Sequence, residues 1–203
     1  GYAVKVSLWG ARGDVSVVGP QTRQYGVNTP CVQIECDGAD TLILDGGIGL
    51  HWLGNTLLAE AFGSGKGTAH IFFSHTNWSH IQGVPFFVPL LIPGNLIYLY
   101  GRGGLYSTQN ILCDQMSPAY CPVPDFFDDA IGAEVKVSDL AESPIRLGSL
   151  LVEYAEIGLF HGSPRLGYRI SDEANTLTYI PAVEYSDDVC LLYTSPSPRD
   201  SSQ

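Results

Sequence analysis

Short apolar or alternating segments, separated by glycine-rich and proline-rich turns, dominate the hydrophobic pattern of this chain. Segments of this length that are rich in β-branched and aromatic residues predict strands. The predicted strands cover residues 4–9, 31–36, 41–45, 69–74, 96–100, 134–137, 150–155, 166–170 and 176–180. Leucines at helical spacing predict a helix over 50–62, and two shorter helices are expected near 81–88 and 104–115.

The order of these elements indicates the fold class. Helices occur early and hairpins late, one of them turning through 171–175, and strands outnumber helices. A doubly wound parallel sheet needs strands and helices to alternate throughout, so the pattern excludes it. It favours two sheets packed face to face with helices outside. We find no internal repeat and no interdomain linker, and 203 residues suit one domain.

The composition is that of a globular protein with an acidic surface. Apolar residues make up 45% of the chain and charged residues 15%, which is not the composition of a disordered segment. The formal net charge is −11. A protein that binds long nucleic acid by neutralising phosphates needs a basic face, and the sequence contains no sign of one. We therefore expect no nucleic-acid partner.

Cysteine usage and hydropathy bear on the compartment. The five cysteines form no CxxC pair and no zinc-finger spacing. Their odd count, with no secretory signal in the sequence, predicts reduced thiols in a cytoplasmic protein. No apolar run approaches the ~18 residues of a transmembrane helix, so we expect no membrane partner. The oligomeric state is not encoded in any pattern that we recognise.

The end of the chain differs from the rest. The stretch 190–200, CLLYTSPSPRD, resembles the translation of a transposase-type sequencing adapter, and the chain continues there as Ser/Pro-rich sequence without periodicity. We therefore expect a domain over 1–189 that is truncated at its C-terminal end, followed by an artefactual tail over 190–203. An ordinary disordered tail is the alternative.

The polar residues that follow the predicted strand 69–74 are the most informative chemical feature. The segment 74–83 reads SHTNWSHIQG and contains His75 and His80. A rigid strand that aims polar side chains from the loop after it is a common way to build a metal-hydrolase site. The alternative is a strand-end loop whose histidines hydrogen-bond locally.

This segment resembles the His-x-His-x-Asp-His signature of the metallo-β-lactamase superfamily. Other segments resemble its branch of metal-dependent hydrolases related to phosphoribosyl cyclic phosphodiesterases. They are LWGARGD at 8–14, RQYGVNTPC at 23–31, LILDGGIG at 42–49, WSHIQGVPFF at 78–87, LGYRI at 166–170 and TYIPA at 178–182. The resemblance runs from about residue 4 to residue 184. It implies an α/β fold of the α+β type, an αββα four-layer sandwich that is incomplete at the C-terminus.

The resemblance also implies two zinc ions that hold a hydroxide between them. The first ion would use the positions of His75, Asn77 and His161. The second would use the positions of Ser79 and His80 together with a later histidine. A residue at position 182 would bridge the two ions.

Three of these positions depart from the family pattern. Asn77, Ser79 and Ala182 stand where the family has a histidine, an aspartate and the bridging aspartate. The missing aspartates supplied the anionic charge that offsets two dications, because a ligating imidazole is neutral. We therefore expect one zinc ion or none, and little hydrolysis.

Two further groups of residues allow two interpretations each. Asp45 ends the apolar strand 41–45 beside two glycines. It could orient a ligand histidine with its carboxylate, or it could cap a turn. The aromatic residues Trp52, Trp78 and Phe86 are expected in the core, although Trp78 and Phe86 could instead stack on a substrate.

Three functions remain open on the sequence. The first is a descendant of a phosphodiester or ester hydrolase whose metal site has degraded, and whose cleft still binds a small phosphorylated or anionic ligand. The second is an active hydrolase with one metal ion on His75, His80 and His161, with Asn77 or water as a further ligand. The third is a non-catalytic binding or regulatory protein that keeps the fold only as a scaffold.

Overall fold

The structure is a computed structural model that describes residues 4–13, 15–22, 24–126, 128, 131–141, 143–160 and 162–181. The candidate ligand His161, position 182 and the segment 190–203 lie outside the described residues.

A six-stranded sheet forms the centre of the molecule, with its strands in the order in which they occur along the chain. They are β1 (Lys5–Gly10), β2 (Cys31–Glu35), β3 (Thr41–Leu44), β4 (Thr68–Phe72), β5 (Leu96–Gly101) and β6 (Glu134–Asp139). The pairs β1–β2 and β2–β3 are antiparallel, and the pairs from β3 to β6 are parallel. The strands β3 and β4 are almost continuously apolar because both faces of the sheet are covered there.

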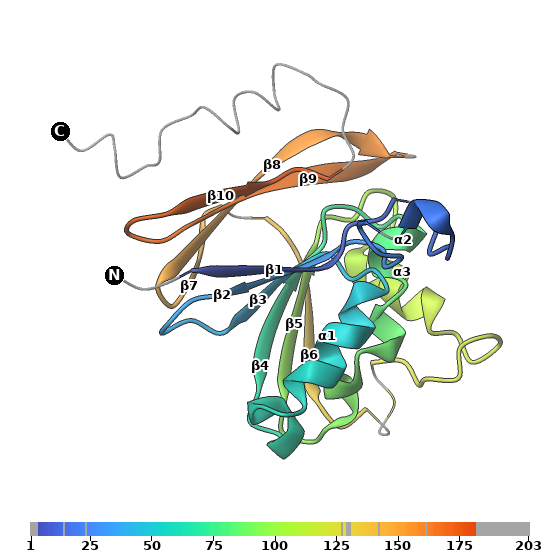
Figure 1. Ribbon diagram of the computed structural model, residues 1–203. Coiled ribbons are helices and arrows are strands. Elements are labelled where there is room, and N and C mark those ends of the chain that lie inside the picture. The colour runs from blue at the N-terminus through green and yellow to red at the C-terminus, as the bar shows by residue number, and fades with distance from the viewer. Residues whose placement is uncertain are drawn as a thin grey trace.

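Helices cover one face of this first sheet (Figure 1). They are α1 (Gly49–Leu57), α2 (Trp78–Ile81) and α3 (Thr108–Gln115), with the short 3₁₀ helices η1 (Pro20–Thr22), η2 (Ala61–Ser64), η3 (Val84–Phe86) and η4 (Val88–Leu91). Leu50, Leu53 and Leu57 of α1 are fully buried and pack against the sheet, as their spacing predicted.

The helices are shorter than the sequence pattern predicted. The segment 50–62 divides into α1 and η2, and Gly65 ends η2 in a left-handed conformation with φ of 69°. The segment 81–88 is mostly 3₁₀ helix, because Pro85 and Pro89 cannot donate helical hydrogen bonds. The third helix begins at Thr108, where the Ser107 side chain accepts a hydrogen bond from the Asn110 amide.

A four-stranded antiparallel sheet packs on the other face of the first sheet. Its strands are β7 (Ile145–Leu147), β8 (Leu150–Phe160), β9 (Ser163–Ser171) and β10 (Thr176–Tyr179), in the order β10–β9–β8–β7. The predicted hairpin through 171–175 is confirmed, whereas the three-residue strand β7 was missed. The core between the sheets includes Leu42, Phe72, Val152 and Ile170.

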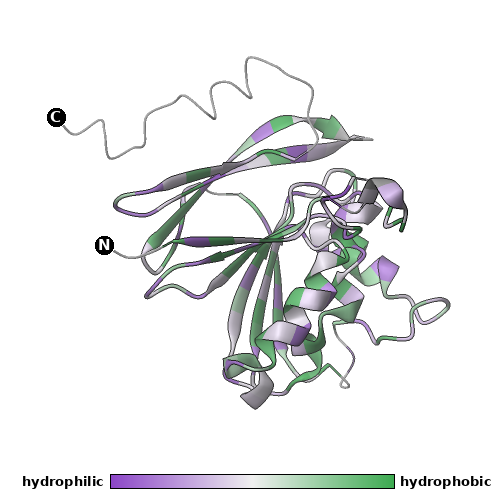
Figure 2. Cartoon of the chain, in the orientation of Figure 1, coloured by the Kyte–Doolittle hydropathy of each residue, from purple (hydrophilic) through white to green (hydrophobic). Residues whose placement is uncertain are grey.

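The described residues therefore form three layers, which are helices, the first sheet and the second sheet (Figure 1). Figure 2 shows apolar residues along the strands of both sheets, where their side chains form the core. The predicted face-to-face packing of two sheets with helices outside is confirmed. In the part of the chain that the structure describes, no helix is long and apolar enough to span a membrane.

Gln115, at the end of α3, allows the free-energy cost of a buried polar side chain to be measured. Gln115 is 7% exposed, and neither amide atom of its side chain has a hydrogen-bond partner among the residues that the structure describes. An unsatisfied buried polar group costs about 1–3 kcal/mol, so Gln115→Leu should raise the free energy of unfolding by about 1 kcal/mol. Urea denaturation measures this change.

Gln33 provides the matched control, because it is equally buried but accepts a hydrogen bond of 3.0 Å from Trp9 Nε1. Gln33→Leu should lower the free energy of unfolding, since it leaves the indole N–H without its partner. Equal effects of the two substitutions would contradict this account.

Candidate functional site

The site forms where β3 and β4 end. The two strands run parallel with Leu44 opposite Phe72, so the residues that follow each strand meet at the same edge of the sheet. Asp45 follows β3, and its amide donates to the Phe72 carbonyl at 2.9 Å. Ser74 and His75 follow β4. The pairing of the strands thus brings Asp45 to the metal-motif segment.

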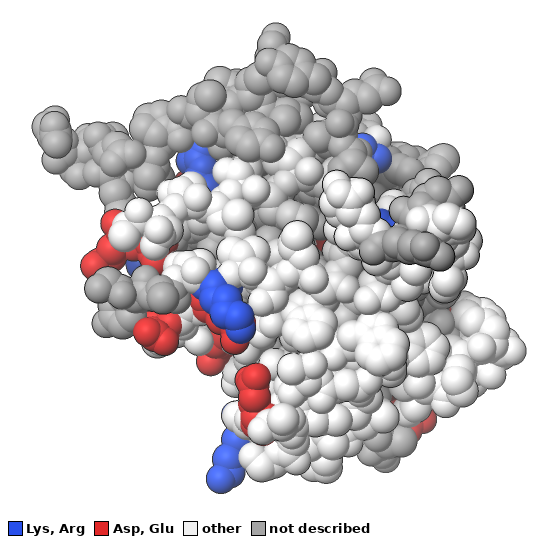
Figure 3. Space-filling view, viewed as in Figure 1, with Lys and Arg blue, Asp and Glu red and all other residues white. Residues whose placement is uncertain are grey.

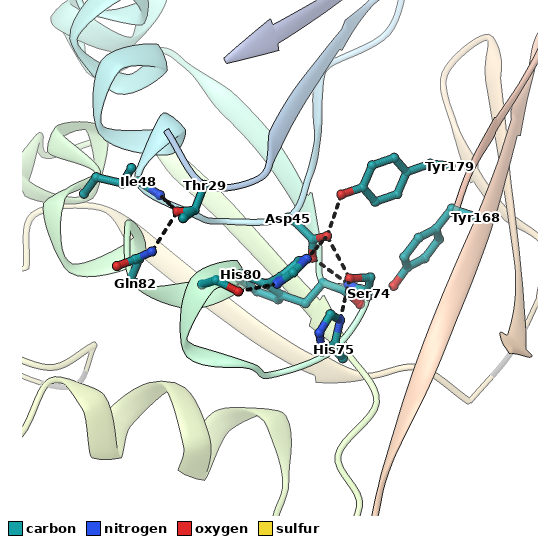
Figure 4. Close-up of polar contacts among 11 residues, drawn as sticks. Thr29, Asp45, Ile48, Ser74, His75, His80, Gln82, Tyr168 and Tyr179 are labelled. Atoms are coloured by element: carbon teal, nitrogen blue, oxygen red, sulfur yellow. Dashed lines mark hydrogen bonds and ion pairs between the residues drawn. The ribbon is translucent and has the colours of Figure 1, made fainter. Parts of the chain in front are cut away.

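The Asp45 carboxylate is the centre of a hydrogen-bond network (Figure 4). It is fully buried and accepts hydrogen bonds from the Ser74 amide at 2.8 Å, from the Ser74 hydroxyl at 2.7 Å and from the Tyr179 hydroxyl at 2.7 Å. Burial raises the pKa of Asp45, while nearby His80 and these donors act in the opposite direction. Its φ of 61° lies in the left-handed region, which is uncommon for a residue other than glycine.

The hydroxyl of Ser74 sets the tautomer of His75. It donates its single proton to Asp45, so its oxygen accepts from Nδ1–H of His75, 2.9 Å away. The lone pair of this imidazole is therefore on Nε2. Burial, with His80 and Arg165 nearby, lowers the pKa of His75 to about 3, so the ring is neutral at pH 7. A neutral ring with a lone pair is the form that binds a metal ion.

His80 lies beside His75, and its two nitrogens face two different side chains. The ring centroids of the histidines are 4.1 Å apart. Nε2 of His80 is 3.7 Å from the Asp45 carboxylate, which favours a proton on that nitrogen. The lone pair is then on Nδ1, where it accepts from the Ser79 hydroxyl at 2.9 Å. Asp45 thus reaches His75 through the Ser74 hydroxyl, and it lies near His80 at a distance that allows an electrostatic contact but no hydrogen bond.

Glycines bring the loop after β3 against helix α2, which carries His80. The Gly46 amide donates to the His80 carbonyl at 2.7 Å, and the Gly83 amide donates to the Gly46 carbonyl at 2.9 Å. A Cβ at Gly83 would lie 2.0 Å from the Gly47 carbonyl oxygen, which no side chain tolerates. The backbone contact therefore requires glycine at this position.

Thr29 ties the same loop to the start of α1. Its hydroxyl oxygen accepts from the Ile48 amide and from Gln82 Nε2, each at 2.7 Å (Figure 4). Because Gln82 follows α2 and Ile48 precedes α1, this contact fixes both helices relative to the site.

The second sheet is attached to the first at this site. The Tyr168 hydroxyl of β9 donates to the Phe73 carbonyl at 2.6 Å, and the Leu166 amide donates to the Ser74 carbonyl at 2.7 Å. Tyr179 of β10 supplies the third contact, to Asp45. No sequence pattern pointed to Tyr168 and Tyr179, although both lie in segments that carry the family resemblance. A tyrosine on a strand gives no signal of a distant partner.

A cavity of about 230 Å³ opens beside His80. It lies between the end of β1 and the end of β10, and its lining includes Gly10, Arg12, Tyr179 and Pro181. Arg12 is its only lining residue with a charged side chain among the described ones, and its Nε donates to the Val15 carbonyl at 2.7 Å. The guanidinium keeps further N–H groups for an anion.

Comparison with solved structures identifies the architecture. The chain is similar to Zn²⁺-bound PqqB from Methylobacterium extorquens, with a TM-score of 0.61 and 17% identity over 91% of this chain. It covers 65% of PqqB, which is less than two thirds of that protein's length. It also matches a Thermotoga maritima protein assigned as a metallo-β-lactamase, at a TM-score of 0.41 and 15% identity over 86% of this chain and 76% of that one. No family profile and no curated protein sequence matches the chain.

The chain has a metallo-β-lactamase fold. This confirms the fold predicted from its motif segments, on the structural similarity and not on sequence identity. The fold by itself does not establish an activity, because function belongs to the residues of the site.

The structure does not bring all the candidate metal ligands of this metallo-β-lactamase-fold site together. The structure brings His75, His80 and Asp45 together. It places Asn77 at the N-cap of α2, where its side chain makes no capping hydrogen bond. Within the described residues, no three His, Cys, Asp or Glu side chains are placed to hold one metal ion. The described donors therefore do not fit a zinc centre by themselves.

Tyr179→Phe tests the network around Asp45. The substitution removes one donor from a buried carboxylate, and a hydrogen bond to a charged group contributes about 1.5–3 kcal/mol. We expect the free energy of unfolding to fall by that amount, as measured by urea denaturation. Tyr154→Phe on β8 is the control, because within the described residues its hydroxyl has no recorded hydrogen bond and its loss should cost less than about 0.5 kcal/mol. A silent Tyr179→Phe would contradict the central role of Asp45.

Proposed function

We propose that this chain is a metallo-β-lactamase-fold protein of the metal-dependent hydrolase type that has lost metal ligands and is weakly active or inactive. In this proposal it descends from a phosphodiester or ester hydrolase of the phosphoribosyl cyclic phosphodiesterase-like branch. It retains the capacity to bind a small phosphorylated or anionic molecule. The fold supports a scaffold of the metal-dependent hydrolase type. The contacts of Ser79, His80 and Arg12, with the residue types at positions 77 and 182, support the lost metal ligands and the bound anion.

The observation that carries the proposal is the contact between Ser79 and His80. The serine hydroxyl lies 2.9 Å from Nδ1, the nitrogen that holds the lone pair when Nε2 faces Asp45. A hydrogen bond from Ser79 occupies the electron pair that a metal ion would need. An aspartate at position 79 could not donate this hydrogen bond and would itself be an anionic ligand.

The remaining positions support the same conclusion. Asn77 offers a neutral amide oxygen in place of an imidazole, and Ala182 has no donor atom. Of the two candidate ligand histidines that the structure describes, His75 is the one whose lone pair, on Nε2, is not directed at a serine hydroxyl. One imidazole is a weak site for zinc, because structural and catalytic zinc sites use three or four protein ligands.

Restoring the family residues tests the metal part of the proposal. Chain purified without added zinc should contain far less than one equivalent by mass spectrometry of the metal. The triple variant Asn77→His, Ser79→Asp, Ala182→Asp should bind zinc more tightly. Loss of an outer-shell partner alone changes metal affinity about 10–100-fold, so restored ligands should gain at least that factor.

Ser64→Asp provides the matched control for the added charge, because Ser64 is exposed on η2 and distant in sequence from the motif. It should leave zinc affinity unchanged. Near-stoichiometric zinc that stays on the unmodified chain, together with phosphodiesterase activity that follows zinc content, would support an active one-metal hydrolase and contradict the proposal.

The ligand part of the proposal is tested at Arg12. The cavity beside His80 has one cationic lining residue, so a phosphate group there should depend on the guanidinium. Arg12→Gln should weaken binding of inorganic phosphate, followed by NMR titration, by about tenfold or more, since a charged hydrogen bond contributes about 1.5–3 kcal/mol. Arg102→Gln is the control, because Arg102 pairs with Glu156 at 2.9 Å outside the cavity lining. Equal losses in both variants would contradict the assignment.

A further inference from the structure

The cavity beside His80 is small and mostly apolar. Its volume of about 230 Å³ is below the ~300–1,000 Å³ of pockets that hold drug-sized ligands. Most of its described lining residues have apolar or aromatic side chains, namely Leu8, Ala11, Pro30, Val32, Tyr179 and Pro181. A ligand that fills this space is small, and its body is apolar, because hydroxyl groups against such walls would lose their hydrogen bonds with water.

The glycine-containing loop over residues 10–13 does not have the geometry of a phosphate-binding loop. Such loops direct several free backbone N–H groups at the ligand. Here the Ala11 and Arg12 amides both donate to the Asn28 carbonyl oxygen, at 3.1 and 2.9 Å. The two prolines in the lining have no backbone N–H to offer. The cavity is therefore poorly suited to a group that needs many backbone donors.

Two polar side chains of the lining are directed at Asp45. The Tyr179 hydroxyl donates to this carboxylate at 2.7 Å, and Nε2 of His80 is buried and lies 3.7 Å from it (Figure 4). The guanidinium of Arg12 is therefore the strongest hydrogen-bond donor that the described lining offers to a ligand.

The Arg12 guanidinium keeps the geometry that pairs with a carboxylate. Its Nε donates to the Val15 carbonyl oxygen, which leaves the N–H groups of both Nη atoms. Arg12 has no ion-pair partner among the described residues. Two parallel N–H groups, one from each Nη atom, match the two oxygens of a carboxylate. The bond to Val15 also limits the rotamer freedom that the side chain would lose on binding.

The charge around the cavity favours a ligand with a single negative charge. A phosphate monoester carries about −1.5 to −2 at pH 7, and one guanidinium neutralises only one of these charges. The excess charge would lie near Asp45, which is one hydrogen bond behind Tyr179, in a chain with a net charge of −11. A monocarboxylate leaves no excess charge.

The acidic side chains of the first sheet lie mainly at its opposite end. The pairing of β1 with β2 places Glu35 at one end of the pair and Gly10 at the other. Glu35, Asp37 and Asp40 line a separate hollow at the first end. Figure 3 shows charged side chains gathered along one margin of the molecule, beside a broad uncharged surface. The cavity beside His80 has no carboxylate among its described lining residues, so it repels an anion less than the acidic end does.

We propose that the cavity beside His80 binds a small monocarboxylate with an apolar body. The carboxylate pairs with Arg12, and the carbon chain lies against Leu8 and Val32, which are opposite one another on β1 and β2. This proposal rests on the anion-binding part of the proposed function and names its ligand class as a carboxylate in preference to a phosphate.

Four small probes test the ligand class, each by NMR titration of the full chain. Hexanoate should shift the resonances of the lining residues in a saturable way. Acetate should bind at least about tenfold more weakly, because each buried methylene contributes about fourfold in affinity. Hexan-1-ol lacks the charge and should lose at least about tenfold as well, since a hydrogen bond to a charged group is the stronger kind. Inorganic phosphate should also bind more weakly than hexanoate.

Two variants separate the charged contact from the apolar one. Arg12→Gln should weaken hexanoate binding about tenfold or more. Leu8→Ser should weaken hexanoate at least about threefold and leave acetate and phosphate unchanged, because those two probes have no chain to pack on Leu8. Leu159→Ser is the matched control, since Leu159 is 70% exposed against 71% for Leu8 and lies outside the lining. Circular dichroism verifies that each variant is folded.

The outcomes distinguish this proposal from the proposed function. Phosphate binding that depends on Arg12 and equals or exceeds hexanoate binding would overturn the carboxylate proposal and leave the proposed function intact. Absence of Arg12-dependent binding of every anion would overturn both. Hexanoate binding that Leu8→Ser leaves unchanged, or that Leu159→Ser weakens equally, would overturn the apolar contact and with it this proposal.

Discussion

The Asp45 carboxylate is the interaction on which the rest of the structure depends. It accepts hydrogen bonds from Ser74 at the end of β4 and from Tyr179 on β10, so one buried group joins the two sheets. A buried carboxylate without such donors would cost several kcal/mol. The same group contacts His75 through Ser74 and lies 3.7 Å from Nε2 of His80. The packing of the sheets and the geometry of the histidines therefore have one common cause.

In the function proposed above, this arrangement explains how the fold persists without the family's full set of metal ligands. In the function proposed above, the Ser79 hydroxyl takes the lone pair of His80 that an ion would otherwise occupy. The backbone contacts of Gly46 and Gly83 hold the loops together without a ligand. What such a site loses is the concentrated positive charge that activates water, and what it keeps is a shaped cavity with one guanidinium at its edge.

Charge is segregated between two parts of the molecule. The helical face from α1 to η4 is almost free of charge, whereas the acidic residues that give the chain its net charge of −11 lie mainly elsewhere. The Thr29 hydroxyl connects this helical face to the site, because it accepts from the residue before α1 and from the residue after α2.

The sequence by itself determined the described strands other than β7, the two-sheet class and the segment that carries His75 and His80, because alternation and motif spacing are local properties of the chain. It also determined which ligand positions lack a suitable donor, since Asn77, Ser79 and Ala182 are read directly. The tertiary structure alone decided that Tyr179 donates to Asp45 across 134 residues, and that Trp52 and Phe86 are exposed. It likewise placed the hydroxyl groups of Ser74 and Ser79 against Nδ1 of His75 and His80, from which the tautomers of these two rings are inferred. Those outcomes depend on which strands become neighbours, and no local pattern records the neighbours of a side chain.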